Sequence, residues 1–148
     1  MIFDFQLSTF DFNMKYWLIK SEPETYSIED LIREDIGRWD GVRNYSARNF
    51  LKDMKLGDLC FFYRSVHKPA VEGICKVVKE HYPDPTADSE TWVCVEVQFQ
   101  NKLNREVSLK EIKTNPALAN MSLLRLSRLS VQPVTVDEFG EILKMSEQ

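Results

Sequence analysis

The sequence predicts a small α+β protein built around a curved β-barrel that is flanked by short helices. Three observations carry this prediction. With 148 residues, of which 43% are hydrophobic and 28% charged, the chain is long enough for one domain that folds without disulfides or metals. Short strand patterns are interrupted by helical patterns, without repeats or low-complexity linkers. Glycines and prolines punctuate the strands at points where a sheet would bend.

The first part of the chain predicts a buried strand and two helices. Residues 16–19 (YWLI) are aromatic or aliphatic throughout, and Pro23 ends the ladder that they can form. A short helix is expected over 27–33, because its first four residues, SIED, match a capping box. A second helix is expected over 46–56, where apolar residues recur at helical spacing and Gly57 follows.

The middle of the chain supplies further strands. Residues 59–63 and 71–78 are apolar strand patterns, and Gly73 within the second indicates a bulge or a tight bend. A turn is expected at 82–85 (YPDP), followed by a strand over 92–99 with partial alternation.

The last third is expected to be mainly helical. Residues 108–124 show short helical patterns that are broken by Pro116, and 128–133 form a brief extended piece. Residues 135–138 (TVDE) match the start of a final helix, whose apolar side chains recur at helical spacing. This order of short strands and helices is typical of an α+β domain.

Residues 1–13 stand apart from the domain expected over 14–148. They hold four of the nine Phe and no basic residue, and they lack the features of a secretory signal. Three interpretations stay open: Met14 is the true start, the segment adds a strand, or it forms a contact in a homodimer. Apolar runs are far shorter than the ~20 residues of a membrane span. Together with three cysteines in apolar strand patterns, this predicts a cytoplasmic protein with no membrane partner.

The segment 39–45 (WDGVRNY) gathers aromatic, acidic, basic and amide side chains around one glycine. A nucleobase requires this combination, because its ring stacks on an aromatic face and its edge needs donors and acceptors. The helix expected to follow directs backbone N–H groups toward the same loop. The alternative is that Trp39 anchors the loop to the core, with Arg43 and Arg48 solvated.

The charge distribution favours one short phosphate-bearing partner over a long duplex. The net charge is -4, yet residues 38–68 carry seven basic residues against three acidic ones, a local charge of +4. A basic field on an acidic protein suits a short nucleic-acid segment. A solvated helix face would carry the same charges.

Enzyme signatures are mostly missing. The sequence has no Gly-rich phosphate loop and no nucleophile elbow, and His67 and His81 lack metal-ligand spacing. The cysteines lie in apolar strand patterns, where burial makes a thiol unreactive. Glu22 and Asp40 are the only carboxylates near the expected site, and they do not by themselves define an acid and a base. The sequence therefore favours binding over catalysis, and it predicts no cofactor and no metal.

Ordered motifs along the chain resemble the EVE domain family, a branch of the PUA-like superfamily that also includes the YTH readers of methylated adenine. The motifs are 16–23 (YWLIKSEP), 39–45 (WDGVRNY) with 47–49 (ARN), 57–58 (GD) leading to 62–65 (FYRS), 82–84 (YPD) and 128–134 (RLSVQPV). The resemblance extends from about residue 15 to 143. Two positions depart from it: Ser46 stands where the family usually has Gln, and Arg64 where it usually has His. They affect the expected fine specificity, not membership.

The resemblance implies a PUA-like curved β-barrel with helices at its openings and a pocket for a flipped, modified base. Modified cytosine in DNA or RNA would be the ligand class, read without catalysis. The residues expected to bind ligand are the rim Lys20, Ser21 and Glu22, the wall Trp39 with Asp40, the hydrogen-bonding group Val42, Arg43, Asn44 and Tyr45, and the closing pair Ser65 and Pro133. The residues expected to contact phosphate are Arg48, Lys52, Lys55, Arg64, Lys68 and Arg128.

Two other functions stay open. An enzyme or sensor for a free modified nucleoside or small metabolite could use the same pocket, and it would bind mononucleosides independently of salt. A pure interaction module would assemble through residues 1–13. The sequence does not distinguish DNA from RNA or identify the modification.

Overall fold

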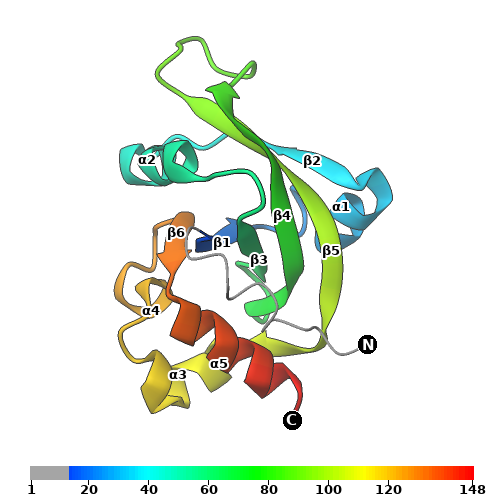
Figure 1. Cartoon of the computed structure of the whole chain (residues 1–148), viewed down its shortest axis with the longest axis vertical. Coiled ribbons are helices and arrows are strands. Elements are labelled where there is room, and N and C mark those ends of the chain that lie inside the picture. Colours follow the sequence, from blue (N-terminus) through cyan, green and yellow to red (C-terminus); the bar gives the residue numbers. More distant parts are fainter. Residues whose placement is uncertain (1–13) are drawn as a thin grey trace.

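The computed structural model describes residues 14–148, so the interpretations of residues 1–13 lie outside the described part. Six strands of this part form one mixed sheet, in the order β2-β5-β4-β3-β1-β6 (Figure 1). The strands are β1 (Tyr16–Ser21), β2 (Ile36–Trp39), β3 (Leu59–Arg64), β4 (Ala70–Pro83), β5 (Val93–Ser108) and β6 (Val131–Val134). The helices are α1 (Ile28–Glu34), α2 (Tyr45–Asp53), α3 (Leu109–Thr114), α4 (Ser122–Arg125) and α5 (Val136–Ser146), with the 3₁₀ helix η2 (Pro116–Leu118). The α+β prediction is confirmed.

The sheet owes its curvature to β4 and β5, the two long strands in Figure 1. Their pairing shifts register several times, including between Val71 and Gly73, so the predicted bulge at Gly73 is confirmed. A Cβ atom at Gly73 would lie 2.7 Å from Ile28 Cδ1 and 2.8 Å from the Asn101 carbonyl oxygen. Only glycine therefore lets β4 approach α1 and β5 this closely.

The predicted barrel is found only in part, because the curved sheet stays open. In residues 14–148, β2 pairs with β5 and β6 pairs with β1, but β2 and β6 do not pair with each other. Both end strands have only four residues, and Pro133 in β6 has no N–H to donate. Helix α2 packs against both β5 and β6, so a helix covers the opening that a closed barrel would have sealed.

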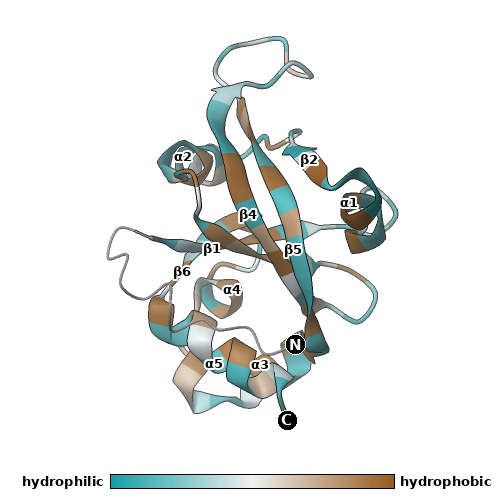
Figure 2. Ribbon diagram, turned by 45° about the vertical axis from the view of Figure 1, so that its right-hand side comes forward, coloured by the Kyte–Doolittle hydropathy of each residue, from teal (hydrophilic) through white to brown (hydrophobic). Residues whose placement is uncertain are grey.

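Alternating side chains divide the interior into two cores, one on each face of the sheet. On one face, residues such as Trp17 and Phe62 pack with α1 and α2. On the other face, Phe61 stacks on Phe139 of α5, and α3 and α4 complete this second core. Figure 2 shows the matching alternation of hydrophobic and hydrophilic positions along β4 and β5. None of the described helices is long and apolar enough to cross a membrane.

Three local predictions were wrong or incomplete. Trp39 lies at the end of strand β2 and not in a loop; β2 is too short, and too interrupted by Gly37, to show a strand pattern. Strand β4 continues to Pro83, beyond the predicted start of the turn. Trp92 precedes β5 and is only partly buried, and the strand continues to Ser108, beyond the predicted end at residue 99. The three cysteines are buried and free, as their strand patterns indicated.

Candidate functional site

A hollow of about 520 Å³ opens where β1 and β2 end, and we call it the first hollow. Its lining residues are Lys20, Ser21, Glu22, Thr25, Tyr26, Arg38, Trp39, Asp40, Gly41, Val42, Arg43, Ser65 and Ser130. Eight of the eleven residues predicted to bind ligand are in this set. The structure thus brings most of the predicted site together, and their role in binding stays a prediction.

The end of β1 places three backbone segments at the floor of the first hollow. Strands β1 and β3 are parallel and pair Ser21 with Arg64, so both chains leave the sheet at the same edge. The Ser65 N–H donates to the Ser21 carbonyl at 3.0 Å, and the Lys20 N–H donates to the Ser130 carbonyl at 2.9 Å. Ser65 and Ser130 consequently flank the end of β1 on its two sides.

Trp39 belongs to the core and also borders the first hollow. Only 7% of the residue is exposed, and its ring meets Tyr26 and Phe62 edge-on, with centroids 6.0 and 5.6 Å apart. The two interpretations of Trp39, core anchor and pocket wall, are therefore compatible in position. Replacement by alanine would remove core packing worth about 3–5 kcal/mol, so a smaller change is needed to test the wall.

Tyr26 is a lining residue that sequence analysis missed. Its hydroxyl donates to Glu34 Oε1 at 2.6 Å, and burial together with Glu34 raises the pKa of Tyr26. A Cβ atom at Gly37 would lie 2.5 Å from this hydroxyl, so the glycine in β2 makes room for the tyrosine. The available signal was an aromatic residue directly before the capping box that begins at Ser27.

The loop 40–43 is held from the opposite hairpin by one carboxylate. Asp84, whose side chain is fully buried, accepts hydrogen bonds from the Gly41 N–H at 2.8 Å and Arg43 Nη1 at 3.0 Å. It also accepts from the N–H and hydroxyl of Thr86. Burial raises the pKa of Asp84, but these hydrogen bonds outweigh burial and lower the pKa to about 2. Asp84 is ionised near neutral pH, and it fixes the backbone of the hollow's outer wall.

The first hollow takes its charged groups from Lys20, Glu22, Arg43 and a surface ion pair. Lys20 Nζ donates to the Ser127 carbonyl at 2.7 Å and lies 5.9 Å from the centre of the Tyr63 ring. Burial lowers the pKa of Lys20. At the open side, Arg38 Nε lies 2.8 Å from Asp40 Oδ2, and both side chains are partly exposed. The hollow thus offers an ammonium, hydroxyls and a carboxylate around an aromatic wall.

Three predicted ligand-binding residues lie outside the first hollow. The Asn44 side chain caps α2 by accepting from the Ala47 N–H at 2.9 Å. Tyr45 is 63% exposed, and its ring lies 5.0 Å from that of Trp92. Pro133 sits on β6 opposite Trp17.

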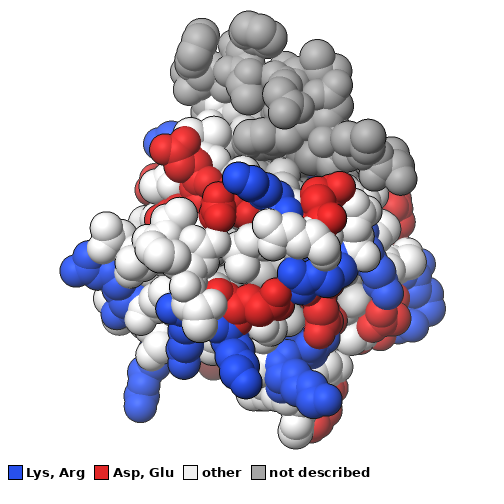
Figure 3. All heavy atoms as spheres, turned by 90° about the horizontal axis from the view of Figure 1, so that it is seen from below, with Lys and Arg blue, Asp and Glu red and all other residues white. Residues whose placement is uncertain are grey.

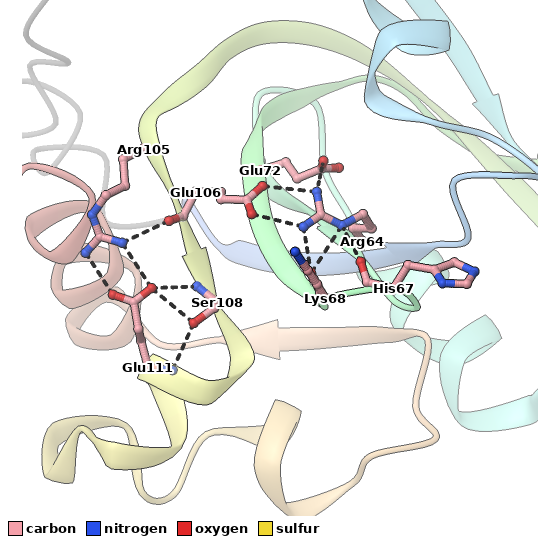
Figure 4. A network of polar contacts seen from close by, with 8 residues as sticks. All are labelled: Arg64, His67, Lys68, Glu72, Arg105, Glu106, Ser108 and Glu111. Atoms are coloured by element: carbon pink, nitrogen blue, oxygen red, sulfur yellow. Dashed lines mark hydrogen bonds and ion pairs between the residues drawn. The ribbon is translucent and has the colours of Figure 1, made fainter.

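The residues predicted to contact phosphate differ in their surroundings. Lys52, Lys55, Lys68 and Arg128 are exposed, and the guanidinium of Arg48 lies 5.1 Å from the Tyr45 ring centre. Arg64 differs from them, because it is only 17% exposed and lies in the network of Figure 4. It pairs with Glu72 at 2.6 Å and Glu106 at 3.0 Å, and it donates to the carbonyls of His67 and Lys68. This arrangement indicates a structural role for Arg64.

Charges of both signs are interspersed on the end of the molecule seen from below in Figure 3. This end includes α3 and α5, and it lies away from α2 (Figure 1). Within residues 14–148, no group of three or more His, Cys, Asp or Glu side chains is placed to hold a metal ion.

These features define a class: a small α+β domain whose open, curved sheet carries a hollow lined by aromatic, hydroxyl and charged groups. Within that class, the model of the EVE domain family matches residues 15–145, and the chain belongs to this family. Thymocyte nuclear protein 1 of Mus musculus is 42% identical over 166 residues, covering 89% of this chain and 74% of the mouse protein.

Solved structures show the same fold. The human THYN1 protein, in a crystal structure with 5-methylcytosine containing DNA, is 39% identical, with a TM-score of 0.84 over 90% of this chain and 98% of the human chain. The YTH domain of the MRB1 protein of Zygosaccharomyces rouxii is only 14% identical, with a TM-score of 0.59 over 90% of this chain and 86% of that one. The second likeness shows a shared fold, which the resemblance to the YTH readers implied.

Proposed function

We propose that this protein reads a modified base in nucleic acid without catalysis, and that the first hollow receives the base after it has flipped out of its strand. Modified cytosine in DNA is the proposed ligand. The observation that carries the proposal is the position of the hollow's lining residues in a chain 39% identical to a human protein crystallised with 5-methylcytosine containing DNA.

The shape and chemistry of the first hollow support a flat, polar-edged ligand. Its volume of about 520 Å³ lies within the ordinary range for small-molecule sites. Trp39 and Val42 offer apolar surface, while Lys20 and the hydroxyls of Ser21 and Ser65 offer hydrogen bonds. A base stacked on the former can present its edge to the latter.

Recognition of a methyl group by burial alone would be weak. A buried methyl contributes about 0.8 kcal/mol, which corresponds to roughly fourfold in affinity. Larger discrimination needs polar groups that stay unpaired when the wrong base enters. We assign this task to the hydrogen-bonding residues of the floor and of loop 40–43, and we assign general affinity to Trp39.

The test compares two tryptophans of the same sheet. Trp39 borders the first hollow, whereas Trp17 is equally buried but lies outside its lining. In a fluorescence titration with oligonucleotides containing 5-methylcytosine, Trp39→Phe should weaken binding by roughly two- to fivefold, because the smaller ring keeps only part of the stacking surface. Trp17→Phe should destabilise the fold and leave affinity unchanged. If both variants bind with the affinity of the wild type, the first hollow takes no part in recognition of the base.

Two further measurements separate this proposal from a sensor or enzyme. Binding of a modified mononucleoside that equals oligonucleotide binding and does not vary with salt would favour a sensor of free nucleosides. Mass spectrometry of nucleosides after long incubation should show unchanged bases. Turnover that disappears in Glu22→Gln or Asp40→Asn would assign a catalytic carboxylate.

We also propose that exposed basic residues hold the backbone of the ligand. Changing Lys52, Lys55 and Lys68 together to Gln should weaken modified and unmodified oligonucleotides alike and flatten the salt dependence, because phosphate contacts carry no base information. A loss confined to the modified oligonucleotide would contradict this assignment.

A further inference from the structure

A second hollow, of about 480 Å³, lies next to the first one between α2 and the loop 126–130. Its lining residues are Asn44, Ser46, Phe50, Leu126, Ser127, Arg128 and Leu129. Asn44 and Arg128, which the sequence predicts to bind ligand and phosphate, line this hollow and not the first one. Leu126 is 55% exposed and adds accessible apolar surface to this second hollow.

The two hollows are bordered by the same two chain segments. Arg43 lines the first hollow and Asn44 lines the second; Ser130 lines the first and Leu129 the second. Consecutive Cα atoms are about 3.8 Å apart, so the two hollows adjoin at both places. Lys20 also links them, because it lines the first hollow and its Nζ atom bonds the Ser127 carbonyl of the second at 2.7 Å.

The lining of the second hollow has the three kinds of group that a nucleotide needs. Phe50, Leu126 and Leu129 give apolar surface for a base or sugar. Asn44, Ser46 and Ser127 give amide and hydroxyl groups for a polar edge. The lining includes one cation, Arg128, and no Asp or Glu, so its charge is complementary to a phosphate.

We propose that the second hollow binds the nucleotide next to the modified base on the same strand. The inference rests on the proposed function, since it requires a base in the first hollow. In this arrangement the strand passes over the rim between the two hollows, where Lys20 and Arg128 offer positive charge to its phosphate. The protein would thereby read a modified base in a preferred neighbourhood and not as an isolated nucleotide.

The test uses short single strands whose neighbouring base can be removed. The probes are 5-methyl-deoxycytidine monophosphate, a trinucleotide with 5-methylcytosine at its centre, and the same trinucleotide with an abasic position on the 5′ or the 3′ side. The wild type should bind the complete trinucleotide about fivefold or more tightly than one of the two abasic forms, because a stacked base adds that much affinity.

Leu126→Ala should abolish this difference and leave binding of the monophosphate unchanged. Leu56→Ala is the matched control, because Leu56 is 63% exposed and lies outside both hollows. It should behave like the wild type. Arg128→Gln should weaken binding of the complete and the abasic trinucleotides alike, because it removes a phosphate contact and not a stacked base.

The outcomes distinguish the two proposals. If the wild type binds no probe and no modified oligonucleotide, the proposed function fails and this inference fails with it. If the wild type binds the trinucleotides equally with and without each neighbouring base, only the second hollow is excluded. A Leu126→Ala variant that loses the monophosphate as well would show that the two hollows are one site. If an amphipathic peptide displaces the complete trinucleotide and not the monophosphate, and the neighbouring base adds no affinity, the second hollow is assigned to a protein partner.

Discussion

Two segments of this protein are held in place by charged side chains of opposite sign. The loop 40–43 at the first hollow is held through its backbone N–H at Gly41 by the carboxylate of Asp84. The turn between β3 and β4 is held through the carbonyls of His67 and Lys68 by the guanidinium of Arg64 (Figure 4). The loop at the candidate site therefore depends on a carboxylate, which can be protonated, whereas the turn depends on a guanidinium, which stays charged.

The two segments also differ in how their backbone reaches the left-handed region. Loop 40–43 uses Gly41, with φ at 79°, where no side chain is strained. The turn places His67 and Lys68 at φ of 55° and 60°, so it accepts strain at two residues and offsets this strain with the hydrogen bonds from Arg64. The loop held by the Asp84 carboxylate is therefore unstrained, whereas the turn held by the Arg64 guanidinium is strained.

Replacement of Asp84 should have the largest effect on stability and on binding. Asp84→Ala leaves the Gly41 N–H, Thr86 and Arg43 without their acceptor, and we expect a loss of about 3 kcal/mol in the free energy of unfolding. Affinity for a modified oligonucleotide should fall even under conditions where the variant is folded. Urea denaturation and titration measure both effects. Asp88→Ala, at an exposed position of the same hairpin, is the control and should change neither.

Replacement of Arg64 should lower the free energy of unfolding by a smaller amount and should leave binding unchanged. Arg64→Ala leaves Glu72 without its partner, and we expect a loss of about 2 kcal/mol, because Glu106 is half-exposed and can be solvated. Oligonucleotide affinity and its salt dependence should stay at wild-type values. A flatter salt dependence of binding in this variant would indicate that Arg64 contacts phosphate, as the sequence predicts.

A pair of glycines gives a sharper version of the comparison. Gly41 and Gly57 both have positive φ, at 79° and 89°, and a Cβ atom at either position would meet nothing within 4 Å. Alanine at either should cost about 1 kcal/mol from backbone strain alone. Gly41→Ala should also weaken ligand binding, because it distorts the wall of the first hollow, whereas Gly57→Ala should not. Equal binding by the two variants would show that the loop tolerates the distortion.

Acidification should have the smallest effect, and only at low pH. The pKa of Asp84 is about 2 in the folded protein, below its ordinary value of 3.8. Its contribution to stability is therefore complete above pH 3.8 and is lost as the pH falls from 3.8 toward 2. The stability difference between the wild type and Asp84→Asn should be constant down to that window and shrink within it.

Glu111 also has a pKa lowered to about 2, chiefly by the hydrogen bond from Arg105 (Figure 4). Glu111 titrates in both the wild type and Asp84→Asn, so its contribution cancels when the stability of one protein is subtracted from that of the other. The pH dependence of this difference therefore reports on Asp84. A difference that does not change with pH would mean that Asp84 stabilises the loop equally when protonated.

Local chemistry in the sequence predicts much of this molecule. The capping boxes at Ser27 and Thr135 mark the starts of α1 and α5, and the apolar run at 16–19 marks β1. The motifs at 20–22 and 39–43 supply most of the residues that meet at the first hollow. They follow β1 and β2, which do not pair, and only the curvature of the sheet brings the ends of these two strands together.

Long-range pairing accounts for what the sequence did not show. Strand β2 has four residues with no strand pattern, and only its ladder with β5 makes it a strand. Asp84 is 43 residues from Gly41, and nothing local distinguishes it from a turn aspartate. The sequence alone indicates that Arg64 is a surface cation, because its partners Glu72 and Glu106 lie on other strands. Tertiary contacts decide each of these cases.

The proline in β6 has a consequence for the behaviour of the protein at high concentration. The edge of an open sheet can template a strand from another molecule and so begin aggregation. The Lys20 N–H donates to the Ser130 carbonyl, and the alternation of an antiparallel ladder then turns the ring nitrogen of Pro133 away from β1, toward the free edge. At the centre of this short edge, an incoming strand would find no donor. The β6 edge of this open sheet is thus poorly suited to recruit a strand from another copy of the protein.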